Sequence, residues 1–305
     1  MRPIIKPDPP QLDTLSFAEF ARVLGNAVGR FCSFCEKALT YRLLLFHKQR
    51  GLLTTDSQIS TTDWPDLLLI CGDCAASVTT FTPHAVYFWP DTSAAQQAPY
   101  VYNRVDNIAV TALDPDGTVI AQGATSLVLV QISTDISQEL QVAARNTYAL
   151  FRLNGRFFNE SVQQPAYTLP YAEYVHPSDA RLDQRWDVYL RAVEAAQGLA
   201  RAIPTIPLGP AYVQTMLAMI NLSVQGFGFH STWLATISAT LNAMDSSLLP
   251  KLLGLMTGQP APQPPLDRKR VYIQMEDGVQ QAPAEVDRKR ARLEQTLARL
   301  IATQA

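Results

Sequence analysis

The feature that most constrains this chain is the spacing of its cysteines. The 305-residue sequence contains four, Cys32, Cys35, Cys71 and Cys74, arranged as two C-x-x-C pairs. Two such pairs a few dozen residues apart are typical of a structural zinc site, where four thiolates complete a tetrahedron with no open position. Disulfides are the weaker interpretation for a cytosolic chain, and a thioredoxin-type redox site needs one pair. Four buried, unpaired cysteines are the remaining alternative. If zinc binds, local folding depends on it.

The composition indicates a folded chain of one to three domains. Hydrophobic residues make up 47% and charged residues 17%, which is enough apolar material for a sizeable core. The formal net charge of −2 argues against a protein that coats nucleic acid. The proline-rich start "MRPIIKPDPPQLD" does not resemble a signal peptide, and no apolar run reaches the roughly 20 residues that span a bilayer. We therefore expect a cytoplasmic protein without a membrane segment.

The segments around the two cysteine pairs resemble the HNH endonuclease family. "FCSFC" (31–35) is similar to the first knuckle of many members, "LLLFHKQRG" (43–51) to the histidine segment, and "WPDLLLICGDCA" (64–75) to the second knuckle. The resemblance implies a ββα unit that holds one catalytic divalent ion beside a separate zinc. By position, it makes His47 the general base and places Asp66 where the family has an asparagine that orients the histidine.

The chain departs from the family pattern at three positions. Phe46 stands where an acidic metal ligand is usual, Asp66 lacks the amide of the asparagine, and Ala75 replaces the last ligand, normally Asn or His. Asp66, Asp63 and His84 are the candidates for a shifted ligand set. A one-metal phosphodiesterase without its ligands loses most of its rate. The resemblance therefore predicts a zinc-braced scaffold that has lost its catalytic ion.

Looser similarities to a bacterial subgroup of the family extend over most of the chain. They include the proline-rich start, "FWPDT" (88–92), "TYALFRLNGRF" (147–157) and "GFGFHSTWL" (226–234). Relatives of this kind often belong to bacterial defence or conflict loci, so the resemblance implies a partner protein or a larger assembly.

The hydrophobic pattern predicts an α+β fold that ends in a mostly helical part. Phe17, Phe20, Leu24 and Val28 recur at helical spacing. An Asp-Gly turn predicts a β-hairpin within 105–133, helices are predicted at 137–153 and 178–203, and two apolar helices at 210–257, the second broken at Pro250. The predicted domains are an HNH-like zinc-binding domain (1–100), a β-hairpin region with helices (101–205), a helical part (206–258), and a Pro-rich linker with a C-terminal helix (259–305).

Two further patterns have plain structural interpretations. Leu182, Trp186, Leu190 and Val193 are expected to share the buried face of the helix at 178–203. Its alternating charges, Asp179, Arg181, Asp183 and Arg185, predict a solvated face with local ion pairs; a nucleic-acid or partner surface is the alternative. His230 is expected in a packed core or at a helix start.

Three hypotheses about function follow. The first is a zinc-binding, catalytically degenerate HNH-like scaffold subunit. The second is an active DNA endonuclease with His47 as base, in which case a second divalent ion binds. The third is a zinc-dependent adaptor outside this family. No nucleotide-cofactor motif is present in the sequence.

Overall fold

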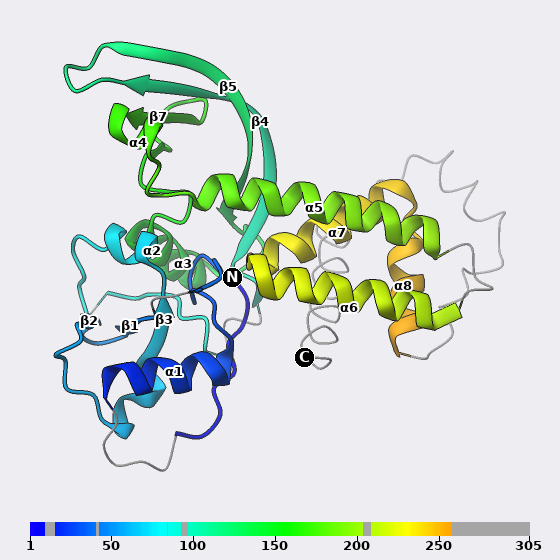
Figure 1. Ribbon diagram of the computed structural model, residues 1–305, viewed down its shortest axis with the longest axis horizontal. Helices are drawn as coiled ribbons and strands as arrows, with labels where there is room; N and C mark the ends of the chain where they lie inside the picture. The colour runs from blue at the N-terminus through cyan, green and yellow to red at the C-terminus, as the bar shows by residue number, and fades with distance from the viewer. Residues whose placement is uncertain (10–15, 41–42, 84, 93–96, 204–208, 258–305) are drawn as a thin grey trace. The chain divides into compact units, whose positions relative to one another are not determined.

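The structure is a computed structural model that describes residues 1–9, 16–40, 43–83, 85–92, 97–203 and 209–257 (Figure 1). These residues form a mixed α and β protein in two compact units. The first unit comprises residues 1–189 and 225–232, and the second comprises 190–224 and, within the described chain, 233–257. The predicted domain boundaries stay predictions, and the predicted C-terminal linker and helix lie outside the described residues.

Helix α1 (Phe17–Val28) is the first helix of the first unit. Ser16 and Glu19 form a capping box, because the Ser16 side chain accepts from the Glu19 N–H while the Glu19 carboxylate accepts from the Ser16 N–H. Phe20 and Leu24 are fully buried, so the predicted apolar face is confirmed at its centre.

A three-stranded antiparallel sheet of order β2-β1-β3 follows. Its elements are β1 (Leu44–His47), β2 (Gly51–Leu52), a 3₁₀ turn η1 (Thr61–Asp66), β3 (Leu67–Ile70) and the short helix α2 (Gly72–Ser77). All four residues of β3 are buried, which explains its continuous apolar sequence.

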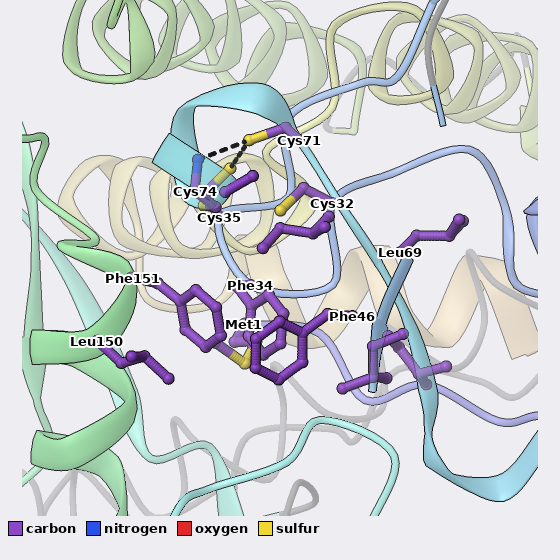
Figure 2. Close-up of a cluster of buried hydrophobic side chains, with 14 of the residues drawn as sticks. Met1, Cys32, Phe34, Cys35, Phe46, Leu69, Cys71, Cys74, Leu150 and Phe151 are labelled. Atoms are coloured by element: carbon purple, nitrogen blue, oxygen red, sulfur yellow. Dashed lines mark hydrogen bonds between the residues drawn. The ribbon is translucent and has the colours of Figure 1, made fainter. Parts of the chain in front are cut away.

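The core beside this sheet is built on aromatic rings. Phe34, from the first cysteine pair, stacks on Phe151 with ring centroids 3.7 Å apart, and Phe46 meets both rings edge-on. Figure 2 shows these three rings directly beneath the cysteines. The cysteine segment is therefore part of the hydrophobic core.

A second sheet of order β5-β4-β7-β6 contains the predicted hairpin. Strands β4 and β5 form the long, curved pair in Figure 1, and Gly117 in their turn has φ +88°. The bounds are β4 Tyr100–Leu113, β5 Val119–Ile132, α3 Gln138–Phe151, β6 Phe158–Asn159, β7 Ala166–Pro170 and α4 Tyr171–Val175. The predicted hairpin and the predicted helix at 137–153 are confirmed.

Helix α5 (Arg181–Ala202) confirms the third predicted helix, and of its predicted buried face Leu182 is buried whereas Trp186 and Val193 are only half-buried. Leu190 is 45% exposed, whereas Arg181 and Arg185 are completely buried. The prediction of a solvated face was therefore wrong for these two arginines. Both arginines donate hydrogen bonds to acceptors on other elements of the fold. The charge pattern of the sequence does not reveal such long-range acceptors.

Three helices follow α5: α6 (Gly209–Phe227), α7 (His230–Met244) and α8 (Leu248–Thr257). The predicted break near Pro250 occurs earlier, at residues 245–247. Pro250 lies in the first turn of α8, where its missing N–H has no intrahelical partner to lose. His230 begins α7, as expected for a helix-start histidine. Within the described residues, none of the helices combines the length and apolar character required to cross a membrane.

Candidate metal centre

The first cysteine pair lies in a tight turn between α1 and β1. The Glu36 N–H donates to the Cys32 carbonyl at 3.0 Å, and the Cys32 N–H donates to the Lys37 carbonyl at 2.9 Å. Glu36 closes the turn with φ +67°, in the left-handed region. The Ser33 N–H also donates to the carbonyl of Leu69 on β3 at 2.8 Å, so the turn is fixed to the strand that leads to the second pair.

The second pair lies where β3 passes into α2. Cys71 is the N-cap of α2, and its sulfur accepts from the Cys74 N–H at 3.4 Å. The Ala75 N–H donates to the Cys71 carbonyl at 2.9 Å. The C-x-x-C spacing therefore sets both sulfurs on one side of the first helical turn, as Figure 2 shows.

The four sulfur atoms come together in one buried cluster. All of them lie within 4.8 Å of one another, and the sulfurs of Cys35 and Cys71 are 3.5 Å apart. Zinc–sulfur bonds of 2.3 Å in a tetrahedron place the sulfurs about 3.8 Å apart. The four cysteines are free thiols with at most 4% of their surface exposed. The donor set thus fits a closed, structural metal site, as the sequence predicted.

The electrostatics of the cluster favour neutral thiols unless a cation binds. Burial and the neighbouring thiols raise the pKa of the Cys74 thiol well above its ordinary value. A bound cation reverses this tendency because it stabilises the thiolate form directly. Outside the cluster, Lys37 and Asp73 form an ion pair at 2.8 Å, so these two charges compensate each other.

Arg181 is a member of this site that sequence reasoning missed. Its Nη1 donates to the Cys74 sulfur at 3.3 Å and to the Phe151 carbonyl at 2.8 Å. Arg181 lies 107 residues after Cys74. In the sequence Arg181 is one of four alternating charges at the start of a predicted helix, a pattern that has no specificity for a metal site.

His47 lies at the other end of the β1–β3 pair from Cys71. The register runs from Leu44 opposite Ile70 to His47 opposite Leu67, so the histidine is about 13 Å along the strand from Cys71 of the second knuckle. It is 5% exposed. The Gln49 N–H donates to its Nδ1 at 3.1 Å, so the neutral ring carries its proton on Nε2 and donates to the Asp63 carboxylate at 3.2 Å.

Asp63, and not Asp66, is the carboxylate on His47. Asp66 contributes its backbone carbonyl, which accepts from the Lys48 N–H at 3.0 Å. The second oxygen of Asp63 accepts from the Ser60 N–H at 2.8 Å and pairs with Arg50 at 3.0 Å. Burial alone raises the pKa of Asp63, but the hydrogen bonds from Ser60 and His47 and the charge of Arg50 outweigh it and lower the pKa.

The other positions compared with the family contribute no ligand. The Phe46 side chain is completely buried and packs against Phe34, Phe81 and Phe151, and Ala75 is buried on α2. His84 lies outside the described residues. Across the part of the chain that the structure describes, the four cysteines are the sole group of three or more His, Cys, Asp or Glu side chains that converge as metal ligands.

Comparisons of the chain with protein-family models, with curated proteins and with solved structures find no match.

Proposed function

We propose that this protein is a zinc-braced, HNH-like module that has lost catalysis and serves as a binding or scaffold subunit of a larger assembly. The order of elements supports the proposal. A hairpin (β1 and β2) lies between the cysteine pairs, β3 pairs with β1, and α2 starts at the second pair. The HNH resemblance implies a hairpin followed by a helix; here the third strand β3 stands between them, so the support is the hairpin between the two cysteine pairs and the helix at the second pair.

The observation that carries the loss of catalysis is the set of contacts around His47. The acidic ligand of the family is replaced by Phe46 in the aromatic core. Both oxygens of Asp63 already accept hydrogen bonds or pair with Arg50. A divalent ion beside His47 needs several oxygen or nitrogen ligands. The ring of His47 and the carboxylate of Asp63 are already hydrogen-bonded or ion-paired, and Phe46 has no ligand atom.

Zinc is the metal we propose for the thiolate cluster, with iron as the other ion that favours four sulfur ligands in a tetrahedron. Elemental analysis of the purified full chain distinguishes them. We expect about one zinc per chain, lost in Cys74→Ser. Protein that contains iron instead, or no metal in stoichiometric amount, contradicts the zinc brace.

A nuclease assay tests the loss of catalysis. Supercoiled DNA and single-stranded RNA are incubated with the full chain and Mg²⁺, Mn²⁺ or Ni²⁺, beside His47→Ala and Asp63→Asn. We expect no cutting that distinguishes the wild type from His47→Ala, because within the described residues no second group of ligands converges at His47. Metal-dependent cutting by the wild type that His47→Ala abolishes would instead support the rival hypothesis, an active DNA endonuclease that uses His47 as base.

A further inference from the structure

Arg181 is the one charged side chain whose hydrogen bond reaches a cysteine sulfur among the contacts of the described residues. Its guanidinium is completely buried, and its donors meet five acceptor atoms. These acceptors are the Cys74 sulfur (3.3 Å), the Phe151 carbonyl (2.8 Å), the Ser77 hydroxyl (3.2 Å) and both oxygens of Asp179 (2.7 and 2.8 Å). Since a guanidinium has five N–H groups, all of them are used.

This geometry fixes the guanidinium independently of any metal. Asp179 holds it by a two-pronged ion pair, which is the strongest arrangement for an arginine and a carboxylate. The Phe151 carbonyl ends α3, and Ser77 ends α2. The remaining N–H is therefore aimed at Cys74 by groups from three other places in the fold.

A hydrogen-bond donor in this position changes how strongly the Cys74 sulfur binds a metal. Four thiolates around a divalent cation carry a net charge of −2, which is costly in a buried place unless hydrogen bonds and opposite charges compensate it. An N–H···S bond stabilises the sulfur lone pairs, so the thiolate forms more readily and donates less electron density to the metal. Groups that orient metal ligands in this way contribute about 10- to 100-fold in metal affinity.

We propose that Arg181 is a positioning residue of the metal centre: it holds the Cys74 thiolate by an N–H···S hydrogen bond and tunes its bond to the metal. The inference rests on the proposed thiolate metal site. It goes further because it assigns a residue of α5 to a centre whose ligands all lie before residue 75.

Arg185 provides a matched control on the same helix. It lies one turn after Arg181 and is equally buried. Its N–H groups reach oxygen atoms: the carbonyls of Val128 (3.1 Å) and Leu153 (2.9 Å) and the side chain of Asn154 (3.3 Å). Loss of either arginine removes a buried guanidinium, but loss of Arg181 alone removes a bond to sulfur.

The experiment uses the full chain loaded with Co²⁺ alone, because the sulfur-to-cobalt charge-transfer band reports how strongly the thiolates donate. In Arg181→Met we expect this band to move to longer wavelength and the metal affinity, measured by competition with a chromophoric chelator, to fall about 10- to 100-fold. Arg181→Lys, which keeps a positively charged N–H donor group, should recover part of both effects. Arg185→Met should lower thermal stability and leave the band in place.

The outcomes separate this inference from the proposed metal centre. If the wild-type protein shows no tetrahedral cobalt–thiolate spectrum, the proposal of a metal centre is itself wrong. A normal wild-type spectrum with an unchanged band and affinity in Arg181→Met overturns the role of Arg181 alone. If Arg181→Met does not fold, Arg181→Gln, whose side chain is too short to reach the Cys74 sulfur, is used in its place, and a band and affinity identical to those of the wild type overturn the role. An equal band shift in Arg185→Met also overturns the role of Arg181, because the shift would then follow from the loss of any buried arginine of α5 and not from the loss of the bond to sulfur.

Discussion

His230 is the residue whose ionisation is expected to shape the acid stability of the protein. It is packed near Glu36 of the first knuckle and near Arg2 and the Met1 ammonium of the N-terminal segment. Burial, together with Arg2 and the ammonium, outweighs the attraction of Glu36 and lowers the pKa of His230 from 6.5 to about 4. Between these two pH values the unfolded chain binds a proton that the folded protein does not. Acid therefore favours unfolding in this window.

We predict that the contribution of neutral His230 to the free energy of unfolding is complete above pH 6.5 and is lost as the pH falls towards 4. The full shift corresponds to at most about 3 kcal/mol, and partial exposure of the ring reduces it. Urea titrations at several pH values between 5 and 7 measure the free energy of unfolding. His230→Gln should flatten the slope in this range, and an unchanged slope in that variant would contradict the assignment.

Single residues differed in how well the sequence revealed them. The four cysteines could be predicted because chelation imposes a fixed local spacing, and all four meet in the fold. Arg181 could not, because alternating charges do not reveal which arginines turn inward. The carboxylate on His47 was expected at Asp66 by analogy with the family, but the 3₁₀ turn brings Asp63 to the ring.

At the scale of elements, the start of α7 is held against the first knuckle by a glycine. Gly228 has φ +75°, and a Cβ built on it would lie 2.3 Å from the Glu36 carbonyl oxygen and 2.6 Å from the Ala38 nitrogen. The next residue, Phe229, donates its N–H to that same Glu36 carbonyl at 2.8 Å. Two backbones thus touch where no side chain fits.

We therefore predict that Gly228→Ala lowers the free energy of unfolding by more than about 3 kcal/mol, since both the conformation and the space are wrong for a methyl group. Gly226→Ala is the control two residues earlier, in α6, where a Cβ meets nothing within 4 Å. It should change stability by about 1 kcal/mol or less, towards greater stability. Equal effects of the two substitutions in chemical denaturation would refute the close-contact explanation.

Elements with a strong local signal were predicted, and those defined by long-range contacts were not. The apolar period marked α1, helix propensity marked α3, and the Asp-Gly turn marked the β4–β5 hairpin. The parallel pairing of β7 with β4 joins residues far apart in the chain, so no local pattern indicates it. The buried face of α5 was mistaken at Leu190 for the same reason, because the buried arginines depend on acceptors from α2, α3 and β5.

At the scale of the whole molecule, the four-cysteine cluster belongs to one of the two compact units. Its four sulfurs lie in the hydrophobic core that also contains Phe34, Phe46 and Phe151. A structural zinc in a small site contributes about 10–16 kcal/mol of binding free energy, whereas whole domains are stable by about 5–15 kcal/mol. The first unit is therefore expected to lose most of its stability with its metal.

Hydrogen–deuterium exchange resolved by mass spectrometry can locate that loss. When a strong chelator removes the metal from the full chain, we predict that amides of β1, β3 and α2 exchange much faster, because the ligands are fixed to these elements. Amides of α7 from Ile237 to Met244, which lie in the second unit, should keep more of their protection. Cys74→Ser in the presence of zinc should reproduce the pattern of the chelated wild type, which excludes an effect of the chelator itself. Unchanged exchange in β3 would mean that the cysteines do not brace the fold, and equal loss in α7 would mean that the metal stabilises the entire chain as one cooperative unit.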